Sequence, residues 1–536
     1  MSNLRNDEKK QWIESQSNRD TNELQQYTVR MQREYAQIKT QFSTSNPVLR
    51  DNKAETTDFF SQFYKKITEH ELDVYNHLTM TKWNDRYNKA NIPNNKMNTT
   101  NVSLLESMDN YTANINFKID RINDSVVMPS PKMFDTLRHN YDNGRSRNNN
   151  EYRFIPQIIY TYIRENAEWW IQFKSRVNNR DIILHFITFP DSKISVCSTH
   201  LNNGISGQMC AQEIAIYQTY AYKVFLWLTM ISNMADKECS GSSLNIYFYM
   251  TPFKKNIPAA TPSTREGDTL SAIHVNTGVT RNCENNGEIV IYRFEEWFKV
   301  FVHESMHNFN MDFIDTDLTK MNERLGDAFF IPNGDILLFE SYTETWARII
   351  NTMFETYFDP NVRNQSSFIH NVRDKLERNA IFSTFQLTKV LELMELKYAN
   401  ITIRSKENEI LCRKQYSEDS NIYAYYVLGG LLTVYALPFI SWCIHNNRHT
   451  SASIRNNYRR NHIVDSIRFL NLSNGEMLYK FVDFMIEAAR DSQMLSLVAF
   501  CEKQLSKNLS SIHNNRHSIK ASTDVVRIAI TLRMTI

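Results

Sequence analysis

The stretch of residues 294–309, FEEWFKVFVHESMHNF, constrains the fold more than any other part of this chain. Its large apolar residues recur at steps of three and four, which is the pattern of a helix with one buried face. The alternating segment 287–293, GEIVIYR, comes directly before it and is typical of a β-strand. The sequence therefore predicts a strand that leads straight into a helix of the core.

The same helix carries His303-Glu304-Ser305-Met306-His307, an HExxH motif. At about 100° per residue, both imidazoles and the Glu304 carboxylate lie on one arc beside the apolar face. Neutral imidazoles are zinc ligands, and a neighbouring carboxylate can act as a general base. The alternative is two core histidines that fall four apart by chance. We favour a site for one Zn²⁺ per chain, with His303 and His307 as ligands and Glu304 as the base.

A third ligand is expected on a second helix, over residues 339–358, FESYTETWARIINTMFETYF. Glu340 and Glu344 lie four apart on one face of this helix, and Glu340 follows His307 by 33 residues, which lets the chain turn back. We predict Glu340 as the ligand and Glu344 as the acceptor of an imidazole N–H. Two solvated glutamates are the other interpretation. Alternatives for the third ligand are Glu344, Asp312 and Asp315.

Elsewhere the chain alternates expected strands, at residues 180–189 and 243–251, with an expected helix at 210–234, so the fold class is α+β. An apolar stripe between Leu24 and Phe42 predicts an amphipathic helix, which either packs on the body or forms a coiled coil that drives oligomerisation. The expected parts are a helical N-terminal arm at 1–100, an α+β part at 101–240, a catalytic core at 241–360 and a mainly helical part at 361–536.

Composition argues against several function classes. Lys and Arg number 61 against 59 Asp and Glu, so no strong positive field would attract nucleic acid, which is not an expected partner. Seven cysteines without a C-x-x-C pair favour a reducing compartment, and the polar start argues against a secretory signal. The segment 422–444 is uncharged and long enough to cross a membrane, but its glycines, tyrosines and Pro438 favour a buried helix or a broken helix pair.

HESMH followed by ESYTE resembles the gluzincin pattern of zinc peptidases, in which a distant E-x-x-x-D/E follows HExxH. More narrowly, residues 245–358 resemble the predicted metallopeptidases encoded by nucleocytoplasmic large DNA viruses. The resemblance implies a zincin-like core and a zinc peptidase acting on proteins or peptides in the host cytoplasm or the virion. Glu344 departs from the pattern, since aspartate is frequent at that place. A catalytically silent, virion-associated protein of zincin fold is the alternative, and the intact Glu304 favours the enzyme.

In zincin-like folds an extended substrate can pair with a strand at the sheet edge near the active-site helix. The candidates are residues 274–280, HVNTGVT, and 287–293, with Asn276 and Gly278 as substrate-binding residues; an ordinary hairpin loop is the alternative. A peptidase also needs a donor for the oxyanion. The sequence leaves six candidates for this donor: Tyr342, Tyr423, Tyr425, Tyr426, His370 and His445.

Overall fold

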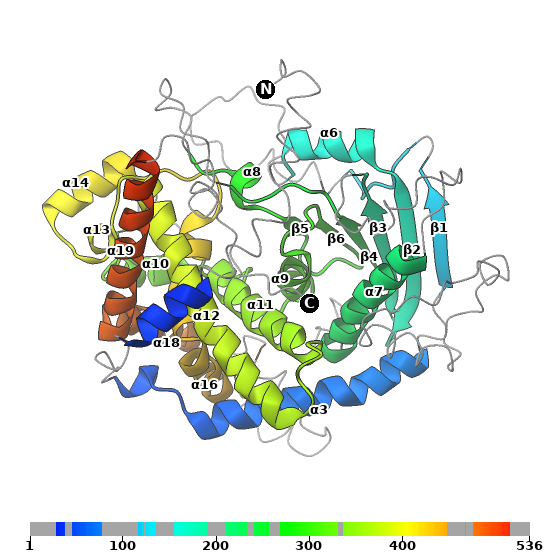
Figure 1. Ribbon diagram of the computed structural model, residues 1–536, viewed down its shortest axis with the longest axis horizontal. Coiled ribbons are helices and arrows are strands. Elements are labelled where there is room, and N and C mark those ends of the chain that lie inside the picture. The colour runs from blue at the N-terminus through cyan, green and yellow to red at the C-terminus, as the bar shows by residue number, and fades with distance from the viewer. Residues whose placement is uncertain are drawn as a thin grey trace.

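The computed structural model describes residues 28–37, 46–77, 116–122, 125–131, 133, 155–178, 180–190, 211–232, 241–256, 269–330, 336–447, 467 and 475–514. Within them the fold is mixed α+β, as the sequence predicts, with a sheet on one side and helices on the other (Figure 1). The expected boundaries of the four parts stay predictions.

A six-stranded mixed sheet has the order β1-β2-β3-β4-β6-β5. Strands β3, β4 and β6 are parallel, whereas β1 and β2, and β5 at the opposite edge, run antiparallel to their neighbours. The three predicted strands are confirmed, and β2 was missed although its inward residues Ile171 and Phe173 alternate with polar ones. The bounds are β1 Asn116–Arg121, β2 Trp169–Val177, β3 Arg180–Thr188, β4 Ser243–Tyr249, β5 Gly278–Thr280 and β6 Asn286–Ile291.

The two faces of the sheet enter different hydrophobic clusters, as the alternation of side chains along a strand requires. One face packs against α7 (Ala211–Ile231) and α9 (Trp297–Asn308), with Phe248 5.6 Å from Phe301 between ring centroids. The other face packs against α6 (Gln157–Asn166). The catalytic candidates therefore lie on the face covered by α9.

The two predicted motif helices are α9 and α11 (Leu338–Tyr357), and both are confirmed as helices. Every residue of α9 is buried, because the helix lies between the sheet and α11. Phe298 of α9 and Phe354 of α11 pack with their ring centroids 5.0 Å apart. The residue before α9, Glu296, has a positive φ of 59°, which turns the chain sharply from β6 into the helix.

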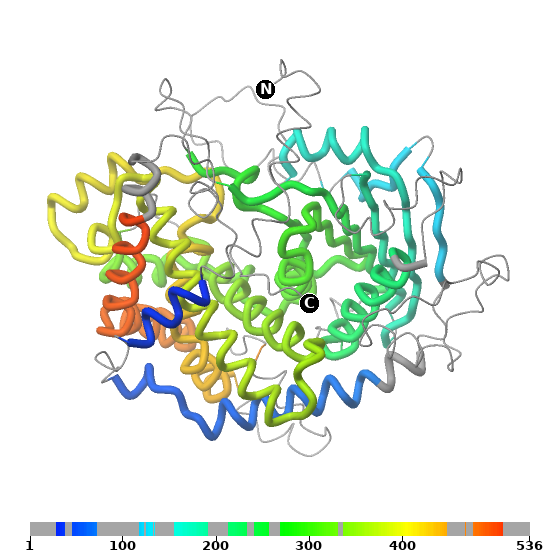
Figure 2. Tube along the Cα trace, viewed as in Figure 1, coloured from blue at the N-terminus to red at the C-terminus, as the bar shows by residue number. Residues whose placement is uncertain are grey.

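Further helices complete the other side of the molecule. Residues 28–37 are helical, and Met31 and Tyr35 are buried against α12 and α19, so this part of the N-terminal arm packs on the body as predicted (Figure 2). Oligomerisation through it stays a prediction. The bounds are η1 Pro47–Leu49, α3 Lys53–His77, α8 Ala272–Val275, α10 Thr319–Leu325, α12 Gln365–Leu393, α13 Tyr398–Thr402, α14 Lys406–Gln415, η3 Tyr423–Leu428, α15 Gly429–Val434, α16 Ala436–Asn446, α18 Glu476–Arg490 and α19 Ser492–Asn514.

The uncharged segment 422–444 forms the π-helical turn η3 followed by α15 and α16. The chain bends by 89° at Tyr435, three residues before Pro438, which lies in the first turn of α16 where proline is tolerated. No single helix among the described residues is long and apolar enough to cross a membrane. Among those residues, this bent pair of helices reaches the required length and apolar composition only when its two helices are taken together. The expectation of a broken pair is thus confirmed.

The described cysteines are of two kinds. Cys412, Cys443 and Cys501 are free and buried, whereas Cys283 is disulfide-bonded. A disulfide is uncommon in the reducing compartment that the cysteine pattern favoured. The localisation stays a prediction.

Candidate metal site

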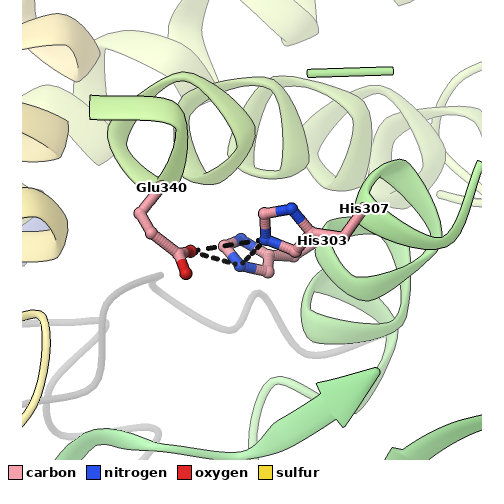
Figure 3. A group of neighbouring side chains, drawn as sticks. All are labelled: His303, His307 and Glu340. Carbon is pink, nitrogen blue, oxygen red and sulfur yellow. Dashed lines mark hydrogen bonds and ion pairs between the residues drawn. The ribbon is translucent and has the colours of Figure 1, made fainter. Parts of the chain in front are cut away.

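The two histidines of α9 and the first glutamate of α11 converge on one point (Figure 3). The Nε2 atoms of His303 and His307 lie 3.0 Å apart, and Glu340 Oε2 lies 3.1 Å from the first and 3.4 Å from the second. Helical spacing brings the histidines together, and packing of α11 on α9 brings the carboxylate to them. The structure thus places the three predicted ligands in one cluster.

This donor set fits a tetrahedral metal ion. Zinc binds imidazole nitrogen and carboxylate oxygen at about 2.0–2.2 Å, so donor atoms of one tetrahedron lie about 3.3 Å apart. The three distances in the cluster bracket that value, and all three donor atoms lie within 4.8 Å of one another. Two nitrogens and one oxygen are also the ligand set of many catalytic zinc sites, which keep the fourth position open.

The outer nitrogens of both imidazoles meet carboxylates. Asp312 Oδ2 is in short contact with His307 Nδ1, accepts from Thr343 Oγ1 at 3.2 Å, and leaves His307 Nε2 free to face Glu340. Glu344 Oε2 lies 3.2 Å from His303 Nδ1, at ion-pair distance but without the alignment of a hydrogen bond. Such partners fix the tautomer and orientation of metal-binding imidazoles.

Glu344 is itself held in a buried ion network. Lys299, one helical turn before His303, donates to both Glu344 oxygens at 2.8 and 2.9 Å, and Arg348 Nε donates at 3.0 Å. Arg348 also donates to the carbonyls of Gly429 and Tyr425, which ties the network to η3. Each of the three charged side chains is 2% exposed. This network fixes the orientation of Glu344 toward His303.

Neighbouring charges shift the pKa values of Glu340, His307 and His303, in each case against the effect of burial. Burial opposes ionisation of Glu340, but the charge of His307 and the hydrogen bond from His303 outweigh it and lower the Glu340 pKa. Burial opposes the charging of His307, but the Asp312 and Glu340 carboxylates raise its pKa well above the usual value. Burial also opposes the charging of His303, whose pKa is nevertheless raised by Glu340 and Glu344. Because a metal ion binds neutral imidazole, the binding of a metal ion here would be linked to proton release.

Glu304 lines the same cavity as the three residues of the cluster. The volume of this cavity is about 360 Å³. Its side chain is 8% exposed, and burial raises the pKa of its carboxyl group. Among the described residues, none donates a hydrogen bond to this carboxylate. Gly278 packs over it so closely that a Cβ there would lie 3.0 Å from Glu304 Cγ and 2.7 Å from Val300 Cγ1. Glu304 therefore combines a raised pKa with a carboxylate that accepts no hydrogen bond from a described residue and lines the cavity, as a general base requires.

The edge strand β5 forms one wall of the cavity. Tyr292 N donates to Thr277 O at 2.9 Å, and Gly278 is paired with Ile291 across the two strands. The backbone N–H and C=O groups of Thr277 therefore point toward β6. In an antiparallel pair the bonding direction alternates, so Gly278 and Thr280 turn their N–H and C=O groups to the free edge. Of the two candidate edge strands, residues 287–293 form β6, which lies between β4 and β5; that candidate was wrong.

The six candidate oxyanion donors are now separated by position. Only Tyr425 of η3 lines the cavity, with its ring centroid 6.1 Å from that of His303. Burial, and then the Glu340 charge, raise the pKa of its hydroxyl well above the usual value, so it stays a donor. The remaining candidates lie elsewhere: Tyr342 donates to Ile467 O, His445 pairs with Glu55, His370 is exposed, and Tyr423 and Tyr426 are buried.

The other predicted residues are placed as follows. Asn276 lines the cavity and accepts from Ser420 Oγ at 2.8 Å. Asp315 is exposed and accepts from Asn282 Nδ2 at 2.9 Å, outside the cluster. Asp312 was considered only as a ligand, so its contact with Nδ1 of His307 was missed. The pairing of Lys299 with Glu344 was also missed. The turn that follows α9 brings Asp312 back to His307, and only its five-residue spacing could have suggested this.

Comparison with protein-family models, with curated proteins and with solved structures finds no match to this chain. The identity of the site therefore rests on its own residues and geometry.

Proposed function

We propose that this protein is a zinc-dependent peptidase with a zincin-like core, acting on proteins or peptides. The observation that carries the proposal is the convergence of His303, His307 and Glu340 beside Glu304 in one cavity. The antiparallel edge strand β5 along the same cavity adds a place for an extended peptide backbone. The resemblance of residues 245–358 to viral metallopeptidases points to a virus as the source.

Each residue has a defined task in this proposal. His303, His307 and Glu340 would hold the zinc ion, which would supply the Lewis-acid chemistry that polarises a carbonyl group and lowers the pKa of water. Glu304 takes a proton from the attacking water as the new C–O bond forms, and returns it to the nitrogen as the C–N bond breaks. The products are a carboxylate and a free amine.

Two further features support the chemistry. The free N–H and C=O groups of Gly278 and Thr280 would hold the peptide as an added strand and align its carbonyl with the cluster. The Tyr425 hydroxyl, whose residue also lines the cavity, would donate to the carbonyl oxygen as negative charge develops. Asp312 and Glu344 would keep the imidazoles oriented.

The test measures zinc content and cleavage of a mixed peptide library for the unaltered protein, His303→Ala and Glu304→Gln. We expect about one zinc per chain in the unaltered protein, much less in His303→Ala, and zinc without cleavage in Glu304→Gln, because only the base is lost. His370→Ala, at an exposed histidine, is the control and should match the unaltered protein.

Two results would contradict the proposal. A protein that holds no zinc and cannot be loaded with it would leave HESMH as a coincidence on a core helix. Bound zinc without cleavage of any peptide would instead favour a catalytically silent protein of the same fold.

A further inference from the structure

The cavity has two distinct ends, because β5 and α9 run side by side in the same direction. Gly278 lies over Val300 and Glu304, while Thr280 Oγ1 accepts from Asn308 Nδ2 at 3.2 Å, near the end of the helix. The start of β5 therefore lies beside the middle of α9, and its end lies beside the last turn of the helix. We call this the Asn276 end of the cavity.

At the Asn276 end the two walls of the cavity meet. Residues 417–421, which lead into η3, cross to the segment before β5 in a short parallel bridge. Asp419 N donates to Leu270 O at 2.9 Å, and Ser420 Oγ donates to Asn276 Oδ1 at 2.8 Å. A peptide lying along β5 would meet this bridge, so there is room for only a short stretch of substrate beyond Glu304.

Two buried lysines line the cavity, one of them fixed at this end. Arg293 donates to the carbonyls of Lys254 and Asn276, which holds Lys255 beside Asn276. The Lys255 side chain is 1% exposed, and its ammonium group donates to Glu296 Oε2 at 2.7 Å, the sole acceptor of that group within the described part of the chain, while the backbone N–H of Lys255 donates to Glu295 Oε2 at 2.6 Å. An ammonium group has three N–H donors, so two remain for a group that enters the cavity.

Acidic groups lie at this end as well. The buried cations nearby are Lys255, Arg293, Lys299 and Arg348, and the carboxylates with buried side chains that accompany them are Glu295, Glu296 and Glu344. Asp419 also lines the cavity here, but it is exposed to water, which screens its charge. Lys255 already pairs with Glu296, and a carboxylate that enters the cavity would give its ammonium group a second acceptor.

We infer that the Asn276 end binds a carboxylate carried by the substrate residue just after the scissile bond. The inference rests on the proposed peptidase function. A peptide added antiparallel to β5 runs from Thr280 toward Asn276 and so presents its C-terminal part to Lys255. The carboxylate is either the free C-terminus of the substrate or an acidic side chain. Lys255 is then a specificity-determining residue for the reaction.

The test compares matched peptides built on one neutral sequence that the zinc-loaded protein cleaves. One pair ends a single residue after the scissile bond, as free acid or as amide; the other pair is longer, amidated, and carries Asp or Asn there. We expect at least about a tenfold higher kcat/KM for the free acid in the first pair or for Asp in the second, as a charge-assisted hydrogen bond provides. The pair that responds identifies the source of the carboxylate.

Variants at Lys255 make the test specific. Lys255→Met should abolish the preference while cleavage of the neutral amide continues. If Lys255→Met fails to fold because Glu296 loses its partner, Lys255→Met combined with Glu296→Gln removes both charges and should behave in the same way.

Two outcomes separate this inference from the proposed function. Cleavage of neutral peptides with no preference in either pair overturns the inference and leaves the peptidase proposal standing. If no peptide is cleaved, calorimetric binding of the acid, amide, Asp and Asn peptides still decides. Equal affinities within both pairs overturn the inference, and tighter binding of a carboxylate form that is lost in Lys255→Met supports it.

Discussion

His303 and His307 on α9 and His185 on β3 are all buried, yet they are surrounded in opposite ways. His185 accepts from Trp170 Nε1 at 3.1 Å, lies 3.3 Å from Asn245 Oδ1 and stacks on Tyr247 at 4.6 Å between ring centroids. No carboxylate touches it among the described residues, and burial lowers its pKa to about 4. His303 and His307 meet carboxylates on both sides, line a cavity and have raised pKa values.

The difference separates a histidine whose surroundings suit a neutral ring in the core from histidines whose surroundings suit a metal ion. A protein interior stabilises neutral imidazole when neutral partners complete its hydrogen bonds, as around His185. Four carboxyl groups around two imidazoles would be a poor way to stabilise a core, because each buried charge loses hydration. They suit a dication, which needs anionic ligands and outer partners. These carboxyl groups are Glu304, Asp312, Glu340 and Glu344.

The largest expected effect concerns the hydroxyl group of Tyr425, which lines the cavity beside His303. Tyr425→Phe should lower kcat about 10²–10³-fold with zinc content unchanged, because only the donor to the developing oxyanion is lost. Steady-state kinetics and metal analysis measure both. Tyr423→Phe is the matched control, two residues away on η3, since its hydroxyl has no partner among the described residues. Equal kcat values for both variants would remove Tyr425 from the mechanism.

The next effect concerns the carboxylate behind His307. Asp312→Asn should weaken zinc binding about 10–100-fold, because His307 loses the charge that orients and polarises its ring. Competition with a chelator of known affinity measures this. Asp315→Asn, at an exposed residue outside the cluster, is the control. If zinc affinity were unchanged in Asp312→Asn, the contact would be structural only.

The packed histidine gives a smaller effect, on stability rather than activity. His185 has a lower pKa in the folded chain, about 4, than the usual 6.5, so the unfolded chain binds more protons between these values and stability falls as the pH is lowered. This group alone should cost about 2 kcal/mol between pH 7 and pH 5. Chemical denaturation at both pH values should show a smaller loss in His185→Phe than in the control His370→Phe. Equal losses would mean that His185 is not kept neutral.

The smallest effect comes from filling the cavity wall. Gly278→Ala places a methyl group 2.7 Å from Val300 Cγ1, 2.8 Å from Ile291 Cδ1 and 3.0 Å from Glu304 Cγ, so these side chains or β5 itself must shift. Cleavage should fall about tenfold with zinc retained, since a small displacement misaligns the base. In Gly430→Ala the new Cβ would meet no atom closer than 3.5 Å, and activity should not change. Full activity in Gly278→Ala would show that β5 does not position the substrate.

Much of the candidate metal site could be predicted from the sequence, because most of its residues form a local pattern. His303, Glu304 and His307 lie within two turns of one helix, so helical geometry alone places them on one side. The helix that carries Glu340 and Glu344 was likewise predicted from its periodicity. That it packs against α9 was inferred only from the 33 residues from His307 to Glu340, which are enough for the chain to turn back. The packing of Phe298 on Phe354 is what brings the two helices together.

The sequence predicts the α+β class, the central strands and both motif helices, because periodicity reports which side of each element is buried. Contacts between distant segments decide which other residues surround the cluster. Tyr425 was one of six candidates for the oxyanion donor, and the position of η3 beside the cavity separates it from the others. Lys255 and Lys299 have no local signature, because their partners Glu296 and Glu344 lie far away in the chain. Asp312 lies only five residues from His307, but the turn after α9 is needed to bring the two side chains together.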